Sequence, residues 1–525
     1  MGKIQVLDCT LRDGGYCNKW QFGKDNIVKV LNGLNKANID IIECGYISDG
    51  ELAKPDSTFY QNMYDLDRIL SGDAKDRMHV VMINYGACDV NKLPMCKNTC
   101  IDGIRLAFHK RDFRNVSADV EILKQKGYKV FLQPMVTMNY SGGELSDLID
   151  IANVIEPYAF YIVDSFGSMK KEELATLYDS LESKLKKNIL IGFHSHNNLQ
   201  LSYSNAVFFL EKAATRDVII DASVYGMGRG AGNLNTELII EYLNRNCGGS
   251  YNLKSVLNIM DEVINYFFQR KPWGYSLPNY LSATYNIHPN YASFLEDKKT
   301  LTYFDMDNIL SSVDIERGSE FDKEYIEQLY VGCMNAEKDE VSKLDIYKSH
   351  ISGKTMLLIA PGKTSGLERD KIISYVKEND VVVTSINFQY EFIKPDYIFV
   401  SNRRRYRELN TNADSRIIIT SNVPGDEYYL KISYGELLNN EEAVRDNAGL
   451  IFIEFLKKNG IKNIVLAGFD GYSHDYENNY YDDKSAYVIS EETLDLMNTG
   501  MSKVLSEMKK NVNITFLTTP HHIKL

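Results

Sequence analysis

The sequence lacks paired or clustered cysteines. Its eight cysteines include no CxxC pair, and the nearest two, Cys96 and Cys100, have no second pair that would complete a zinc site. Small secreted domains use closely spaced cysteines as a disulfide framework, and that pattern is missing here. We therefore expect free thiols in a reducing compartment, and we predict a cytoplasmic protein.

Long basic tracts and long apolar runs are also absent. The only run of arginines is 403–405 and the formal net charge is −12, which argues against binding to a nucleic-acid backbone. The first residues, MGKIQVLDCTLRDGG, form no signal segment, and no apolar run is long enough to span a bilayer. We expect no nucleic-acid partner and no membrane partner, so small-molecule chemistry fits better.

The composition is that of a large folded chain. Its 525 residues exceed one ordinary core and predict two or three domains. A hydrophobic content of 44% and a charged content of 25% are usual for globular proteins, so wholesale disorder is excluded.

Short β-rich runs alternate with amphipathic segments through the first half of the chain. Three of these segments, 23–38, 117–127 and 170–184, carry apolar residues three and four apart, which predicts helices. The runs that predict strands are IQVLDCT, IDIIECGY, MHVVMINY, GIRLAFH, KVFLQPMV, AFYIVDS, ILIGFHSH and DVIIDASV.

These eight units fit an α/β fold of the (β/α)8 TIM-barrel type over residues 1–250, with the active site at the carboxyl ends of the strands. A doubly wound open sheet is the alternative. It normally has fewer consecutive units and a glycine-rich turn directly after its first strand, so we prefer the barrel.

The secondary-structure pattern of the sequence changes twice after residue 250. Residues 251–315 predict a helical extension, and the charged segment 316–352, which has little β signal, predicts a linker. Over 353–525 the β rhythm returns and predicts a Rossmann-like α/β domain. Its expected strands lie in MLLIAPG, VVVTSI, DYIFVSN, RIIITSN, NIVLAGFDG and ITFLTTP.

The predicted strand ends of this last domain carry polar residues that could bind a ligand. They are Gly362, Lys363, Thr364, Ser401, Asn402 and Asp470. Leu357 stands where a P-loop needs a glycine, so a Walker motif is absent. The pattern faintly resembles Rossmann-like domains that bind nucleotides or nucleotide-sugars in some surface-glycan enzymes. A nucleotide ligand and a structural or partner-binding role both stay open.

The strand at 189–196 ends in His194-Ser195-His196. Because side chains alternate along a strand, the two imidazoles point to one side. They could form half of a metal site, or two histidines held by ordinary hydrogen bonds, and the short pattern alone does not decide.

Arg12 and Asp13 follow the first strand, so in a barrel they share the mouth with His194 and His196. A carboxylate with two imidazoles suits Mn²⁺, Mg²⁺ or Zn²⁺ and leaves positions open for substrate. A surface turn with a neighbouring ion pair is the alternative. The shared location favours the metal site.

The loop DASVYGMGRGAGNLNTE follows the eighth predicted strand. Gly228, Gly230 and Gly232 allow the backbone to approach a ligand, and Asn233 can present an amide oxygen to a metal. A dinucleotide fingerprint is rejected, because the loop follows the last barrel strand and no acidic partner stands at the proper place. A plain flexible loop is the alternative.

Together, LDCTLRDGG, GFHSHNNLQLSYSNA and GMGRGAGNLNTE resemble the DRE-type, HMGL-like superfamily of metal-dependent lyases and aldolases over about the first 300 residues. The segment WGYSLPNYLSATYNIHPNYASFL resembles the extension of the 4-hydroxy-2-oxovalerate aldolase branch. The resemblance implies a TIM barrel, a divalent metal and a 2-oxo acid substrate that reacts through an enolate.

The resemblance also implies roles for individual residues. Asp13, His194 and His196 would bind the metal, with Asn233 as a further ligand in some branches, and Arg12 would stabilise the enolate oxygen. Other residues at the strand ends would line the mouth and bind substrate: Glu43, Tyr46, Arg105, Gln133 and Ser165.

Tyr16 departs from the aldolase pattern, which has a histidine there as the general base for the substrate hydroxyl. A tyrosine with the usual pKa of about 10 is a poor base at neutral pH, although it donates a proton well. His109, at the end of the fourth predicted strand, could serve instead; a packed polar residue is the alternative.

We therefore expect a metal-dependent carbon–carbon lyase of the aldolase type, acting on a 4-hydroxy-2-oxo acid. The loop after the eighth strand has no cysteine, which weakens a CoA-thioester lyase. An acyl-transferring synthase of the same superfamily is one alternative. A non-catalytic metal- or ligand-binding module that supports the C-terminal domain is another, and a homodimer stays open.

Overall fold

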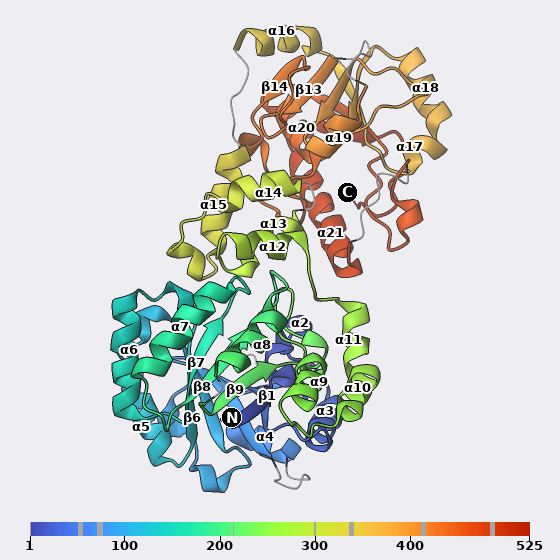
Figure 1. Ribbon diagram of the computed structural model, residues 1–525. Helices are drawn as coiled ribbons and strands as arrows, with labels where there is room; N and C mark the ends of the chain where they lie inside the picture. The colour runs from blue at the N-terminus through green and yellow to red at the C-terminus, as the bar shows by residue number, and fades with distance from the viewer. Residues whose placement is uncertain are drawn as a thin grey trace. The chain divides into compact units, whose positions relative to one another are not determined.

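The computed structural model describes residues 2–50, 56–70, 77–213, 215–298, 301–334, 341–410, 416–482 and 489–524. The chain forms two compact units. One contains Met1–Ser293 and Asp314–Phe321, and the other contains Phe294–Val313 and Asp322–Leu525. Each unit is built around its own parallel sheet (Figure 1).

The N-terminal unit is a closed barrel of eight parallel strands. The order is β1-β9-β8-β7-β6-β5-β4-β2, and β1 also pairs with β2, which closes the ring. The predicted TIM barrel is therefore confirmed. The barrel strands are β1 (Ile4–Asp8), β2 (Ile41–Ile47), β4 (Met78–Asn84), β5 (Gly103–Phe108), β6 (Lys129–Pro134), β7 (Ala159–Asp164), β8 (Leu190–Ser195) and β9 (Val218–Ala222), with the short β3 (Phe59–Tyr60) beside β2.

Helices surround the barrel (Figure 1). The three segments predicted as helices form α3 (Lys24–Lys36), α5 (Ser117–Gln125) and α7 (Lys171–Lys184). The other helices between or after the barrel strands are α1 (Thr10–Asp13), α2 (Gly15–Asn18), α4 (Met63–Leu70), α6 (Gly142–Ile155), α8 (Ser202–Lys212) and α9 (Thr236–Asn246).

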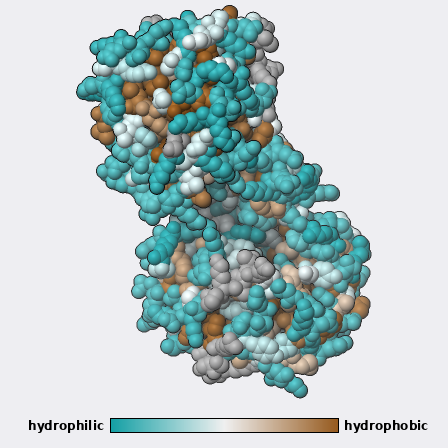
Figure 2. Space-filling view, turned by 180° about the vertical axis from the view of Figure 1, so that it is seen from behind, coloured by the Kyte–Doolittle hydropathy of each residue, from teal (hydrophilic) through white to brown (hydrophobic). Residues whose placement is uncertain are grey.

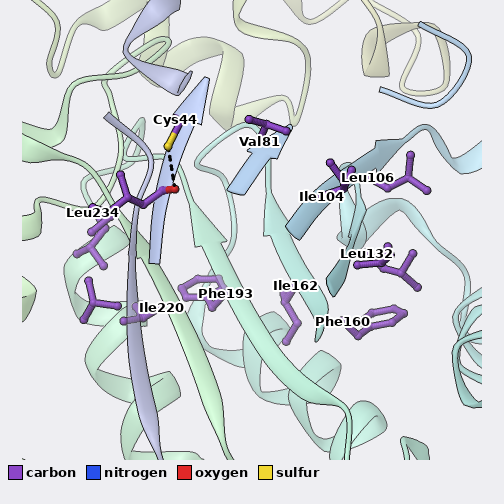
Figure 3. Close-up of a cluster of buried hydrophobic side chains, with 14 of the residues drawn as sticks. Cys44, Val81, Ile104, Leu106, Leu132, Phe160, Ile162, Phe193, Ile220 and Leu234 are labelled. Carbon is purple, nitrogen blue, oxygen red and sulfur yellow. Dashed lines mark hydrogen bonds between the residues drawn. The ribbon is translucent and has the colours of Figure 1, made fainter. Parts of the chain in front are cut away.

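The barrel has two apolar layers because side chains alternate along each strand. Outward residues such as Ile104, Phe160 and Phe193 pack beneath the helices (Figure 3). Inward residues such as Phe131 and Tyr161 fill the interior. Since Phe193 faces outward, the next residue of β8, His194, must face into the barrel. Replacing Phe193 by alanine would cost about 3–5 kcal/mol of stability.

The segment predicted as a helical extension contains α10 (Leu253–Ile259), a π-helical turn at Met260–Ile264, α11 (Asn265–Arg270), α12 (Leu277–Thr284) and α13 (Pro289–Asp297). The hydroxyl of Tyr291 donates to the carbonyl oxygens of Arg317 (3.2 Å) and Glu320 (2.8 Å), which ties residues 314–321 to the extension.

The segment expected as a linker, 316–352, contains α15 (Lys323–Met334) and α16 (Val341–Ile351); α14 (Tyr303–Leu310) precedes it. The functional boundaries at residues 250, 315 and 352 stay predictions.

The C-terminal unit is a seven-stranded parallel sheet in the order β14-β13-β12-β11-β10-β15-β16. This confirms the predicted Rossmann-like α/β domain. The sequence did not predict β14, because a three-residue edge strand gives almost no periodic signal. The strands are β10 (Thr355–Ile359), β11 (Val381–Ile386), β12 (Tyr397–Val400), β13 (Arg416–Thr420), β14 (Leu430–Ile432), β15 (Asn463–Ala467) and β16 (Asn513–Phe516).

The helices that follow the strands of this sheet within the described residues are α17 (Thr364–Leu367), α18 (Arg369–Glu378), α19 (Arg403–Glu408), α20 (Ala448–Lys458) and α21 (Glu491–Met508). Helix α20 is largely buried, and its Phe452 stacks on Phe399 of β12 with ring centroids 4.5 Å apart. The strand order reverses between β10 and β15, which is where open sheets of this type bind ligands.

Hydrophilic residues cover most of the face seen in Figure 2, with smaller hydrophobic patches between them. Within the described ranges, no helix combines the length and the apolar content that crossing a bilayer requires.

Candidate active site

Three buried side chains meet at the carboxyl ends of the barrel strands. Asp13 comes from α1 directly after β1, and His194 and His196 come from the end of β8. Oδ2 of Asp13 lies 3.8 Å from Nε2 of His194 and 3.7 Å from Nε2 of His196. The structure therefore brings together residues that are more than 180 positions apart in the sequence.

These donors suit a divalent metal. One carboxylate oxygen and two imidazole nitrogens lie within 4.8 Å of one another, and all three side chains are buried. Oδ1 of Asn233 is a buried oxygen without a hydrogen-bond partner among the described residues. Nδ2 of the same amide donates to Oδ2 of Asp13 at 2.6 Å. A mixed set of carboxylate, imidazole and amide ligands is typical of Mn²⁺ and Zn²⁺ sites.

The protonation states of the cluster also favour metal binding. Burial raises the pKa of Asp13, but the guanidinium of Arg12 and the two imidazoles outweigh burial and hold this pKa well below its usual range. Burial lowers the pKa of His196 to about 3, although the neighbouring Asp13 opposes this shift. An ionised carboxylate and a neutral imidazole are the forms that bind a metal ion.

A chain of buried charges lies beneath the cluster. Arg12 donates to Oδ1 of Asp13 and to Oε2 of Glu43, both at 2.9 Å. Oε2 of Glu43 also accepts from Arg105 at 2.6 Å, and Arg105 in turn pairs with Asp221. Nη2 of Arg12 is buried and has no partner among the described residues. It is thus a donor available to a ligand.

The glycine-rich loop after β9 approaches the cluster closely. A Cβ atom on Gly228 would lie 2.3 Å from Nδ2 of Asn233, and one on Gly232 (φ +86°) would lie 2.0 Å from a backbone carbonyl oxygen. Gly230 (φ +67°) packs against Asn198, whose Oδ1 accepts from the amide of Ala231 at 2.7 Å. A side chain at Gly228 would displace Asn233, and side chains at the other two positions would displace Asn198 or the loop backbone.

Tyr16 lies at the rim of the mouth. It is 40% exposed, its ring packs against Trp20 at 4.8 Å, and the guanidinium carbon of Arg229 lies 5.3 Å from the ring centroid. Nη1 of Arg229 lies 3.1 Å from Nε2 of His288, which comes from the helical extension.

The structure does not bring every candidate into the cluster. His109 lies on the rim, with Nδ1 3.3 Å from Glu320, and burial lowers its pKa. The hydroxyl of Ser165 accepts from the amide of Val136 at 3.0 Å. Tyr46 stacks on Phe59, and burial raises its pKa well above the usual range. Gln133 is buried beside Arg105 and can accept from Nη2 of that guanidinium at 3.1 Å.

Sequence reasoning missed three polar residues of the mouth: Asp221, Arg229 and His288. Alternation along β9 could have identified Asp221 as an inward-facing residue, because it lies between two outward residues, Ile220 and Ala222. Arg229 stands between Gly228 and Gly230 in the loop that the sequence singled out. His288 carries no local signal, because only the packing of the extension brings it to the barrel.

The C-terminal unit contains a separate cavity of about 830 Å³. It lies at the carboxyl ends of β10, β11, β12 and β15, and its lining includes four of the predicted ligand residues: Gly362, Ser401, Asn402 and Asp470. Lys363 and Thr364 are not among the lining residues. The amide of Thr364 donates to Oδ2 of Asp470 at 2.7 Å, so a protein carboxylate already occupies this loop.

Comparison with known proteins supports the fold and the family resemblance. Residues 99–263 match the model of the HMGL-like family. A 4-hydroxy-2-oxovalerate aldolase from Geobacillus genomosp. 3 is 28% identical over 248 residues, which are 46% of this chain and 71% of that protein. The enzyme of the same name from Carboxydothermus hydrogenoformans is 26% identical over 268 residues, which are 50% of this chain and 77% of that protein.

Among solved structures, the N-terminal domain of a candidate aldolase from Bacteroides vulgatus has a TM-score of 0.51 and 28% sequence identity. The likeness covers 57% of this chain and 98% of that domain.

Proposed function

We propose that the N-terminal barrel, which belongs to the HMGL-like family, is a divalent-metal-dependent carbon–carbon lyase that cleaves a 4-hydroxy-2-oxo acid to pyruvate and an aldehyde. One observation carries this proposal: the buried cluster of Asp13, His194 and His196 lies beside an unpartnered nitrogen of Arg12. We propose Mn²⁺ or Mg²⁺ as the metal, with Zn²⁺ as the alternative. The aldolases named above also support the proposal.

Cleavage requires a proton to leave the 4-hydroxyl group while the C3–C4 bond breaks. The electron pair of that bond becomes an enolate of pyruvate, the aldehyde leaves, and C3 then takes up a proton. When bound, the metal supplies a Lewis acid that withdraws charge from the 2-oxo group. Nη2 of Arg12 can donate to the same developing oxyanion, and one such donor is worth about 3 kcal/mol.

Glu43 and Asp13 orient Arg12 for this role. Each accepts one of its N–H groups at 2.9 Å, and Nη2 is the guanidinium nitrogen that keeps no partner among the described residues. Holding the donor in place before the reaction reduces the reorganisation needed in the transition state.

Tyr16 is our proposed proton carrier for the 4-hydroxyl group. Two side chains are candidates, Tyr16 and His109. The ring of Tyr16 lies beside Arg229 of the mouth loop, whereas His109 pairs with Glu320 on the rim.

The decisive experiment is turnover of a panel of 4-hydroxy-2-oxo acids by the full chain with Mn²⁺, following pyruvate release, with Asp13→Asn as the control. We expect metal-dependent release that Asp13→Asn abolishes. Thioester consumption without pyruvate release would favour the acyl-transferring synthase instead. A stoichiometrically bound metal with neither reaction would overturn the lyase and favour a non-catalytic binding module.

For the C-terminal unit we propose a nucleotide-type ligand in the cavity at the β10–β15 switch point. The cavity has the size of a small-molecule site, and doubly wound sheets bind nucleotides at this position. The carboxylate of Asp470 occupies the first loop, so any phosphate would lie elsewhere, for example near Arg405 or at the start of α20.

Calorimetry with nucleosides, nucleoside monophosphates and nucleoside diphosphates tests this second proposal on the full chain. We expect one class to bind, with equal affinity in Asp13→Asn, since the barrel is a separate unit. Failure of all three classes would leave this unit with a structural or partner-binding role. The eight free cysteines fit a reducing compartment, so we propose a cytoplasmic location.

A further inference from the structure

Arg229 is a cation of the mouth to which the proposed lyase steps assign no group of the substrate. Its guanidinium carbon lies 5.3 Å from the ring centroid of Tyr16 of α2, and its Nη2 lies 3.5 Å from the carbonyl oxygen of Ser165. Its Nε atom is buried and has no hydrogen-bond partner among the described residues. A guanidinium that keeps a desolvated N–H unpaired lacks a ligand, since such a group is costly to leave unsatisfied.

No acidic side chain of the described residues lies within ion-pair distance of Arg229, and in this it differs from Arg12 and Arg105. Those two arginines are each balanced by two carboxylates. Arg229 helps to hold down the pKa of Asp13 from a distance, but with no carboxylate partner of its own it is left to bind an anion that enters the mouth.

His288 holds this guanidinium in place. Arginine can only donate, so Nε2 of His288 must accept from Nη1 of Arg229 at 3.1 Å, and a neutral imidazole can do so. Burial lowers the pKa of His288 well below its usual range, and the positive charge of Arg229 lowers it further. The backbone amide of His288 donates to the carbonyl oxygen of Gly318 at 2.8 Å, which anchors the residue.

The two arginines of the mouth, Arg12 and Arg229, indicate the substrate class. A simple 2-oxo acid has one carboxylate beside its keto group, and the metal site with Arg12 accounts for this end of the molecule. A second, separately held arginine at the rim needs a second anionic group. We propose that Arg229 binds a carboxylate or phosphate at the far end of the aldol, so that the substrate is a 4-hydroxy-2-oxo acid with two anionic groups. This inference rests on the proposed lyase function.

The reaction in the opposite direction would join pyruvate to an aldehyde that carries an acid group. Charge-assisted hydrogen bonds from arginine are strong and often bidentate, so they discriminate well between charged and neutral ends. Arg229 would thus determine specificity, while His288 would be a positioning residue that acts through Arg229.

Steady-state kinetics of the full chain with Mn²⁺ tests the proposal. Three 4-hydroxy-2-oxo acids are compared, ending in a methyl, a carboxylate or a phosphate group; the last two separate the two anions. For Arg229→Gln we expect the preference in kcat/KM for the anionic substrate over the methyl substrate to fall about 10- to 100-fold, as loss of one hydrogen bond to a charged group predicts. Arg229→Lys should retain part of it.

Arg114→Gln is the matched control. Arg114 lies on the same unit with 64% of its side chain exposed, and it pairs with Asp147, so its loss should leave the preference unchanged. His288→Ala should raise KM for the anionic substrates more than it lowers kcat. His288→Gln, whose amide oxygen can accept from Arg229, should restore the lower KM.

A second measurement separates this inference from the lyase itself. Exchange of the C3 protons of pyruvate with D₂O requires formation of the enolate. It does not require the second anionic group that Arg229 is proposed to bind. Exchange by the unmodified chain, together with equal kcat/KM for all three substrates, would overturn the role of Arg229 and leave the lyase standing. Absence of both exchange and cleavage would overturn the lyase.

Discussion

Nδ1 of His194 lies 3.0 Å from Oδ2 of Asp221, while Nε2 of the same ring faces Asp13. The carboxylate fixes which ring nitrogen carries the proton, so the lone pair of Nε2 points toward the metal position. Tyr161 donates to the other oxygen of Asp221 at 2.9 Å, and Arg105 holds the pKa of Asp221 below its usual value against the effect of burial. A buried, ionised carboxylate thus orients a proposed metal ligand.

Asp221→Asn should therefore weaken Mn²⁺ binding about 10- to 100-fold, because the imidazole loses the partner that sets its tautomer and orientation. Calorimetric titration with Mn²⁺ measures this directly. Asp217→Asn is the control: Asp217 lies one residue before β9, is exposed, and accepts from the amide of Lys3. Equal Mn²⁺ affinity in the two variants would show that Asp221 does not support the metal.

Gly228→Ala tests how closely the mouth loop approaches the cluster. The added Cβ would lie 2.3 Å from Asn233 and 3.2 Å from Oδ2 of Asp13, so one of them must move. We expect Mn²⁺ affinity to fall by about tenfold or more, the effect of disturbing groups around a metal. Gly142→Ala has open space around it and should bind Mn²⁺ normally. Unchanged affinity in Gly228→Ala would remove Asn233 from the proposed ligands.

Asp8 should make the stability of the barrel depend on pH. Burial raises the pKa of Asp8 to about 6, against hydrogen bonds from Thr10 and Thr236 that lower it. Between about pH 4 and pH 6 the unfolded chain releases this proton and the folded chain keeps it, so stability falls as the pH rises through this range and is constant above it.

Asp8→Asn removes this titration, and its oxygen can still accept from the amide of Thr10. The unfolding free energy of the variant relative to the parent should rise from pH 4 to pH 6 by on the order of 3 kcal/mol. Urea unfolding followed by tryptophan fluorescence reports on the correct unit, because Trp20 and Trp273 both lie in the N-terminal unit. A difference that does not change with pH would contradict the shifted pKa.

The sequence predicted features that depend on local alternation and on the end of a strand. His194 and His196 share a face because they are two residues apart, and Asp13 meets them because all barrel strands end at one mouth. Alternation also places Glu43 and Arg105 inside the barrel, where they form the buried charge chain.

Features that depend on packing between distant segments could not be predicted from local sequence patterns. His288 reaches Arg229 across 59 positions of the chain, and no periodicity encodes that contact. The strand order of the C-terminal sheet likewise depends on which side each crossover takes, so the sequence predicted six of its seven strands but not the cavity at the β10–β15 switch point.

Tyr16 offers the sharpest test of how the proton leaves the substrate. If its hydroxyl carries the proton, Tyr16→Phe should lower pyruvate release about 10²- to 10⁴-fold, the usual contribution of a general acid–base group. Mn²⁺ affinity should stay the same, because Tyr16 is not among the clustered metal donors. Tyr203→Phe, a partly exposed tyrosine on α8, is the control.

Tyr16→His then distinguishes two explanations for the departure from the aldolase pattern. A histidine with a pKa of about 6.5 is a good base at neutral pH. If the barrel is an active lyase that uses the phenol, Tyr16→His should retain part of the activity and shift its pH optimum downward. If the parent releases no pyruvate and Tyr16→His does, the barrel lost catalysis with this residue and acts as a binding module. The pH profile of pyruvate release, measured for both proteins at saturating Mn²⁺, separates the two.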